Sequence, residues 1–192
     1  MSPAGRVSIS SPYAFQHSPS RLLLEVVDKS NTPVCLLHAA SVLRQGLPHR
    51  AVALLLRDKN SRALLTFWPE LGWGFSAYAR VPAGQAFEDC ARDLLRADGL
   101  DPACRVLPLG MAAPCTESRN AFVAFFEARL PLSQALARGK DAERHLLADY
   151  DELRGMAAHF GELLTPLLRG AVQAGYVRPC LLSSQLSANG RA

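Results

Sequence analysis

The sequence predicts a mixed α/β fold, in which one β-sheet is flanked by helices. Short apolar segments bounded by turn residues precede and follow one strongly amphipathic helix over residues 86–98, and helical patterns return near the C-terminal end. Hydrophobic residues make up 49% of the chain and charged residues 20%, which is typical of a packed core. We therefore expect one domain over residues 21–178, with flexible tails over 1–20 and 179–192.

The first elements are expected to be short strands joined by a turn. Residues 22–27 form an apolar run, residues 28–33 are turn formers, and residues 34–37 return as a second strand. A short helix over residues 39–44 is expected to end near Gly46.

A hairpin is predicted next. Residues 51–57 and 63–68 read as strands around the turn cluster 58–61. Pro69 ends the second strand, and residues 71–81, which are rich in Gly and aromatic side chains, should form an irregular strand or loop.

The helix over residues 86–98 is the element that the spacing of apolar side chains predicts best. It follows Gly84, acidic residues come early and basic residues late, as the helix dipole favours, and Gly99 suits the position just past its end. Its apolar face is formed by Phe87, Cys90, Ala91, Leu94 and Leu95.

Two more strands and two helices are expected after it. The strands cover residues 106–112 and 121–128, the stretch 132–149 is polar and uneven, and the helices cover residues 150–158 and 161–174.

Charge and cysteine content exclude several classes of protein. The net charge of +4 suits an anionic ligand, but the scattered Lys and Arg residues do not predict a nucleic-acid binder. No apolar run is long enough for a membrane span and no secretion signal is visible, so we expect a cytoplasmic protein. Five cysteines without a CxxC pair argue against a disulfide framework or a zinc site, and most are expected to be small buried side chains.

Three segments carry a resemblance to a known family. Residues 73–100 resemble the Nudix box and its lead-in, and residues 24–28 with 45–51 resemble the entry to the Nudix domain in the isopentenyl-diphosphate-isomerase-like branch. Residues 120–126 resemble a later core strand, more weakly. The resemblance covers roughly residues 22–170 and implies a Nudix-type α/β/α sandwich with a mixed β-sheet, on which a C-terminal helical segment packs.

The family's metal-binding glutamates are largely replaced in this box. Its first Gly falls on Ala79 and its first Glu on Gln85, and the segment that follows is one residue shorter than in the family motif. The motif's Arg-Glu pair falls on Arg92 and Asp93.

Of the next two motif glutamates, one falls on Arg96 and the other on Ala97. The positive charge of Arg96 repels a cation, so we expect metal binding through this helix to be weak or absent. The box is therefore degenerate.

The resemblance implies Mg²⁺ or Mn²⁺ as the cofactor of an active enzyme. The candidate metal ligands are Asp93 and Asp89, and Glu88 joins them as a candidate catalytic acid. The alternative is that these acids form surface ion pairs, for example Glu88 with Arg92 and Asp93 with Arg96.

Arginines and aromatic side chains are the candidate substrate-binding residues. One hypothesis is that Arg96, with Arg92 or Arg80, takes the place of the metal and binds phosphate directly, since a guanidinium suits paired contacts to phosphate oxygens. The aromatic side chains either line a pocket for a flat group or belong to the core; they are Trp68, Trp73, Phe75 and Tyr78.

Isomerase activity is not expected. The positions that match the isomerases' cysteine and its neighbouring histidine are Tyr78 and Arg80. His49 matches another histidine ligand, but its companion falls on Val42, so we interpret His49 as structural and Glu117 as a surface acid of a loop.

Two functions remain open. One is a hydrolase of a diphosphate-linked, nucleoside diphosphate-type substrate; the other is a catalytically inactive Nudix-fold module that binds a phosphorylated ligand or a protein partner. In either case we expect a phosphorylated small molecule as the partner, allow for a homodimer, and expect neither nucleic acid nor a membrane.

Overall fold

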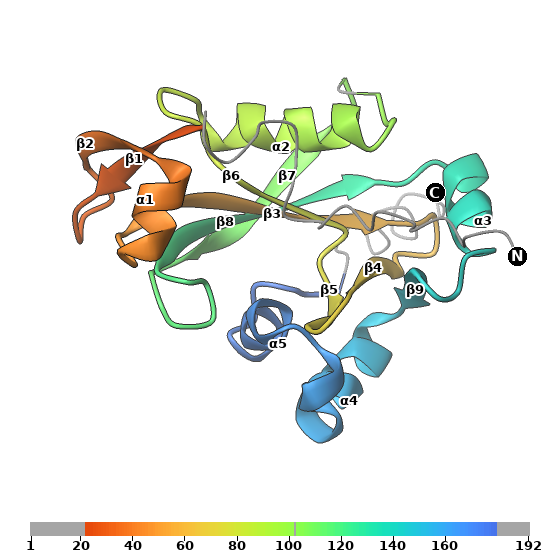
Figure 1. Ribbon diagram of the computed structural model, residues 1–192. Helices are drawn as coiled ribbons and strands as arrows, with labels where there is room; N and C mark the ends of the chain where they lie inside the picture. Colours follow the sequence, from red (N-terminus) through yellow and green to blue (C-terminus); the bar gives the residue numbers. More distant parts are fainter. Residues whose placement is uncertain (1–21, 102, 180–192) are drawn as a thin grey trace, which may run out of the picture.

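The molecule is built in layers, with a mixed β-sheet between helix α2 on one face and helices α4 and α5 on the other (Figure 1). The computed structural model describes residues 22–101 and 103–179. The predicted α/β sandwich with a C-terminal helical segment is confirmed. The predicted tails, over residues 1–20 and 179–192, lie outside the described residues except for Pro179.

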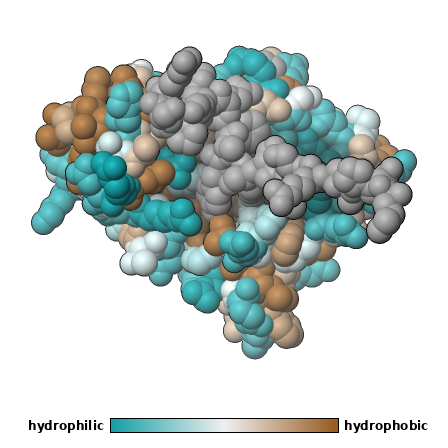
Figure 2. All heavy atoms as spheres, viewed as in Figure 1, coloured by the Kyte–Doolittle hydropathy of each residue, from teal (hydrophilic) through white to brown (hydrophobic). Residues whose placement is uncertain are grey.

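A two-stranded ribbon opens the fold. Strands β1 (Leu23–Val27) and β2 (Pro33–His38) pair antiparallel, and the short helix α1 (Ala39–Arg44) follows directly. One face of β1 packs on α1 in a small apolar cluster whose buried members are Leu24, Val26, Ala39 and Val42. The other face leaves Val34 and Leu36 of β2 exposed, and Figure 2 shows apolar residues gathered over this part of the molecule.

The main sheet is centred on two parallel strands, β3 (His49–Arg57) and β8 (Ala121–Arg129). Strand β7 (Val106–Ala112) pairs antiparallel with β8, while β4 (Ala63–Trp68) pairs with β3 and with β9 (His145–Ala148). Both faces of β3 are covered, which explains its nearly continuous apolar sequence. Its residues alternate between two clusters: Ala51, Ala53 and Leu55 face α4 and α5, whereas Val52, Leu54 and Leu56 face α2.

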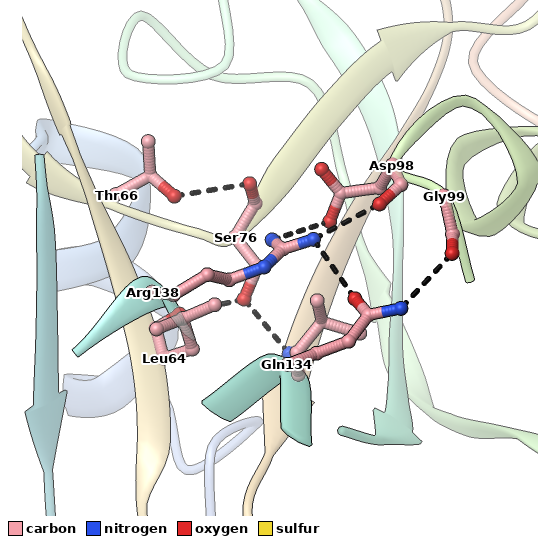
Figure 3. A network of polar contacts seen from close by, with 8 residues as sticks. Leu64, Thr66, Ser76, Asp98, Gly99, Gln134 and Arg138 are labelled. Carbon is pink, nitrogen blue, oxygen red and sulfur yellow. Dashed lines mark hydrogen bonds and ion pairs between the residues drawn. The ribbon is translucent and has the colours of Figure 1, made fainter. Parts of the chain in front are cut away.

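The segment predicted as an irregular strand or loop forms two short strands. Strand β5 (Gly72–Gly74) pairs with β4, and β6 (Ala77–Arg80) pairs with β3. Between them, the buried hydroxyl of Ser76 accepts a hydrogen bond from the Leu56 amide at 2.8 Å and donates one to the Leu64 carbonyl at 2.6 Å (Figure 3). Ser76 thereby joins β3 to β4 at a point where the two strands separate.

Helix α2 (Phe87–Ala97) buries the predicted apolar residues Cys90, Ala91, Leu94 and Leu95, although it begins one residue later than residue 86. Helix α3 (Leu132–Arg138) is attached to the residues that end α2. The guanidinium of Arg138 donates to the Asp98 carboxylate at 2.7 Å, and the Gln134 amide donates to the Gly99 carbonyl at 2.9 Å (Figure 3). The sequence did not predict α3 or β9.

The predicted helix over residues 161–174 is wrong in its first part. The structure has a short 3-10 helix, η1 (Gly161–Leu163), and then α5 (Pro166–Gln173). Pro166 occupies the first turn of α5, where its missing N–H is not needed, and Thr165 caps that helix. The preceding helix α4 (Tyr150–His159) is closed by a capping box between Asp149 and Glu152.

Most of the cysteines are not buried, contrary to the expectation. Cys90 is buried on the apolar face of α2, and Cys104 is half-buried. Cys35 is exposed on strand β2 of the two-stranded ribbon, and Cys115 is exposed in the loop between β7 and β8. Cys180 lies outside the described residues. Within residues 22–101 and 103–179, no helix is both long and apolar enough to cross a bilayer.

Candidate functional site

The exposed face of α2 carries the predicted metal ligands Asp93 and Asp89 together with Glu88, and the charges of Asp93 and Glu88 are paired with arginines. Asp93 forms an ion pair with Arg96 and accepts a hydrogen bond from the Gln85 amide at 2.7 Å. Glu88 is 2.6 Å from Arg92, and Asp89 is exposed on the same helix. The two ion pairs are those that the sequence offered as the alternative to a metal site.

This arrangement does not fit a magnesium or manganese ion. Such an ion needs several oxygen ligands around one point. Among the described residues, no group of three or more His, Cys, Asp or Glu side chains is placed to hold a metal. The Arg96 guanidinium lies against the one acid that remains at a motif position, so a cation would have to displace it.

A pocket of about 380 Å³ lies on the opposite face of the sheet, beside the start of α5. Strands β4 to β6 form one wall, the β7–β8 loop forms a second, and α5 forms a third. The lining residues are Trp68, Leu71, Phe75, Tyr78, Thr116, Glu117, Arg119, Thr165, Pro166, Leu167 and Arg169.

The aromatic wall of this pocket is fixed by the core beneath it. The Trp68 indole donates to the Phe75 carbonyl at 3.3 Å, and the Phe75 ring stacks on Phe125 with ring centres 5.4 Å apart. Tyr78 is half-buried on β6. Trp73 does not line the pocket; its ring packs edge-on against Phe67, with ring centres 5.2 Å apart.

Two glycines of β5 allow the C-terminal helices to approach this wall. A Cβ on Gly72 would lie 2.4 Å from the Leu163 carbonyl oxygen, and one on Gly74 would lie 2.5 Å from the Trp68 ring. The Thr165 amide then donates to the Trp73 carbonyl at 2.8 Å, which attaches the start of α5 to the sheet. The Gly-rich segment is therefore required by close packing.

The β7–β8 loop is held rigidly by one buried hydroxyl. Ser118 Oγ lies 3.1 Å from both the amide and the carbonyl of Cys115, 2.8 Å from the Ala121 carbonyl and 3.1 Å from its amide. The last two loop residues, Arg119 and Asn120, have φ of 52° and 64°. The left-handed backbone at these residues directs the end of the loop back into β8.

Two arginines from separate elements meet at the pocket. Arg119 comes from this loop, and Arg169 comes from the first half of α5, where its side chain lies against Gly161. Glu117 lines the same pocket and is exposed. Hydrogen bonds from its own backbone amide and from the Cys115 side chain lower the pKa of the Glu117 carboxyl, as does the charge of Arg169.

The structure divides the predicted site residues between two places. Phe75 and Tyr78 line the pocket, whereas Arg92 and Arg96, with Asp89, Asp93 and Glu88, lie on α2 across the sheet. Arg80 lies on β6, and its charge contributes to the lowered pKa of His49, which burial lowers most. His49 is 1% exposed, and its Nδ1 lies 3.0 Å from the Leu47 carbonyl, as suits a structural role.

The sequence did not identify Arg119, Arg169 or the two threonines of the pocket as site residues. Two local signals were present: Thr116 to Asn120 is a polar turn directly before a buried strand, and Thr165-Pro166 marks a helix start just before Arg169. The spacing alone did not show that these two segments meet.

No protein-family model matches the chain, and no curated protein matches its sequence. Among solved structures, the crystal structure of DR0079 from Deinococcus radiodurans is similar, with a TM-score of 0.62 at 19% sequence identity over 81% of this chain and 99% of that chain. The NMR solution structure of DR0079, described as a hypothetical Nudix protein, gives a TM-score of 0.38 at 18% identity over 60% of this chain and 72% of that chain. The likeness to the crystal structure shows that this chain has the fold of DR0079.

Proposed function

We propose that this protein is a Nudix-fold binding module for a phosphorylated small molecule, held in the pocket beside α5, and that α2 does not act as a metal site. The supporting observation is the meeting of Arg119 and Arg169, far apart in the sequence, at one pocket with an aromatic wall. The proposal includes the relation to the isopentenyl-diphosphate-isomerase-like branch and the degenerate box, which rest on the resemblance of the sequence alone.

The two guanidiniums suit the anionic part of such a ligand. A guanidinium presents paired N–H groups that match two phosphate oxygens, and its charge persists at all physiological pH values. Arg119 and Arg169 approach from different walls, so a phosphate or diphosphate between them would contact both. Thr116, on the same loop as Arg119, adds a hydroxyl to the pocket lining.

The aromatic wall suits a flat or apolar part of the same ligand. Tyr78 is half-buried and offers a ring, Leu71 and Leu167 extend the apolar lining, and the buried Phe75 backs this wall. Pockets of this kind combine mostly apolar walls with a few polar groups that fix orientation. The volume of about 380 Å³ lies within the range of small-molecule sites.

The charges of α2 support binding without metal-dependent hydrolysis. The guanidiniums of Arg92 and Arg96 are engaged by Glu88 and Asp93, so these two acids and two arginines are available only when an ion pair breaks. Arg119 and Arg169 differ from them in lining one pocket from two separate elements, which suits a ligand that lies between walls.

Calorimetric titration with adenosine diphosphate and with pyrophosphate, both in chelator, tests the proposal. Arg119→Gln and Arg169→Gln should each weaken binding about tenfold, because each removes a charge-assisted contact to phosphate. Arg92→Gln and Arg96→Gln are matched controls that remove the same charge from α2, and they should leave the affinity unchanged. No binding by the wild-type protein, or a loss confined to the α2 variants, would refute the proposed site.

A further inference from the structure

A second cavity of about 300 Å³, which we call the side cavity, adjoins the pocket beside α5. It lies between the end of β7, the β7–β8 loop and α5, and it shares four lining residues with the pocket: Glu117, Pro166, Leu167 and Arg169. The charged residues of its lining, the exposed Glu117 and the half-buried Arg169, therefore both stand on the boundary between the two spaces. A ligand whose phosphate lies at Arg169 can extend into either space.

Beyond this boundary, the side cavity is lined mainly by small and apolar groups. Cys115 and Gln173 contribute polar atoms, and the remaining lining residues are Ala112, Phe125, Gly170, Ala171, Ala174 and Tyr176. Apolar walls favour a hydrocarbon group, because a second charged group would lose its hydration there without gaining a charged partner.

The far wall of the side cavity is fixed by Tyr176. Its hydroxyl donates to the Met111 carbonyl at 3.0 Å, and its ring centre lies 4.9 Å from that of Phe125. A Cβ on Gly110 would lie 2.7 Å from the Tyr176 ring, so a glycine at this position lets the ring lie against β7. The cavity is therefore formed by the packing of the chain itself, as is usual for small-molecule sites.

Gly170 keeps the side cavity open towards α5. It lies inside this helix, where glycine is the least favourable residue after proline. A Cβ on Gly170 would meet no atom within 4 Å in the part of the chain that the structure describes, so no packing contact there requires a glycine. The missing side chain leaves room that a bound group would fill.

We propose that the side cavity binds a short hydrocarbon chain of the phosphorylated ligand, whose phosphate lies at Arg169 on the boundary. This inference rests on the proposed function and adds a ligand class to it, a phosphate ester of an apolar chain. The Arg169 side chain packs along Gly161, where a Cβ would lie 2.9 Å from the Arg169 Cδ, and it lines both spaces. The chain leaves the phosphate towards Gly170, on the side away from the aromatic wall.

A series of alkyl phosphates tests the side cavity on the wild-type protein. Calorimetric titration in chelator compares ethyl phosphate with hexyl phosphate, which carry the same charged group and differ in four methylenes. Hexyl phosphate should bind at least tenfold more tightly, because each fully buried methylene contributes up to about fourfold in affinity. Equal affinities for the two esters overturn the inference, and this result needs no variant.

Gly170→Leu shows whether the chain lies in the side cavity, because the new side chain fills it. The variant should bind hexyl phosphate within about twofold of ethyl phosphate and should keep the wild-type affinity for pyrophosphate. Gly155→Leu is the matched control: Gly155 also lies inside a helix, α4, its Cβ would likewise meet no described atom within 4 Å, and it lines a separate groove. This control should retain the preference for hexyl phosphate. A preference that survives Gly170→Leu places the chain elsewhere and overturns the inference.

The same titrations separate this inference from the proposed function. If the wild-type protein binds pyrophosphate but does not distinguish the two esters, the pocket stands and the side cavity is not part of the site. If it binds neither pyrophosphate nor either ester, the proposed function fails together with the inference.

Discussion

Arg57→Met is expected to lower the free energy of unfolding by roughly 3–5 kcal/mol, because it leaves a nearly buried carboxylate without its partner. Arg57 lies at the end of β3 with its side chain 4% exposed, 2.6 Å from the Glu127 carboxylate, whose side chain is 12% exposed. Its guanidinium also donates to the carbonyls of Ser61 at 3.0 Å and Arg178 at 2.7 Å. It therefore joins β3, β8 and the end of the described chain.

Thermal unfolding monitored by circular dichroism measures this effect. The midpoint should fall by roughly 10 °C for a chain of this size. Arg92→Met removes the same charge from the exposed pair with Glu88 and should cost less than about 1 kcal/mol. The double variant Arg57→Met/Glu127→Leu should recover much of the loss, because no uncompensated charge remains. Equal midpoints for Arg57→Met and Arg92→Met would contradict this role.

Phe125→Ala is expected to cost about 3–5 kcal/mol and to disturb the pocket. Phe125 is 1% exposed on β8, stacks on Phe75 at 5.4 Å between ring centres, and packs on Tyr176 at 4.9 Å. Removing the ring leaves a cavity directly beneath Phe75, which forms part of the aromatic wall.

Phe125→Ala should therefore lower both the denaturant concentration at the midpoint of unfolding and the affinity for pyrophosphate. Phe125→Leu fills most of the same volume, so it should cost under about 1.5 kcal/mol and keep pyrophosphate binding within about twofold of the wild-type value. If Phe125→Ala unfolds at the wild-type denaturant concentration, the ring does not support the pocket as described.

The elements that the sequence predicted are those whose signals are local. The apolar spacing from Cys90 to Leu95 is visible without any knowledge of the fold, and these residues are buried in α2. The hairpin of β3 and β4 follows from a turn cluster between two apolar runs.

The missed elements depend on distant partners. Strand β9 has four residues and exists because Ala63 to Thr66 of β4 pair with it. Helix α3 buries Ala135 but exposes Leu132 and Leu136, so its sequence has no clear apolar face. Its contacts from Arg138 to Asp98 become visible only once the end of α2 is placed.

In the candidate site, too, the contacts between neighbours in sequence were predictable and the contacts between distant segments were not. The acids and bases of α2 stand at i, i+3 and i, i+4 spacing, so their pairing was foreseeable from the sequence. The meeting of Arg119 with Arg169 depends on packing of α5 against the β7–β8 loop, which no local pattern encodes. The need for glycine at position 74 also depends on distant packing, because a Cβ there would clash with the Trp68 ring and the Thr165 side chain.

An assay for phosphate or nucleotide release tests most directly whether the charge pairs of α2 exclude a catalytic metal. The full chain would be incubated with a panel of nucleoside diphosphate derivatives and Mg²⁺ or Mn²⁺, alongside Asp93→Ala. Because Arg96 occupies the Asp93 carboxylate, neither protein should release product above the rate in buffer. Release by the wild-type protein that Asp93→Ala abolishes would contradict this and restore a metal-dependent hydrolase.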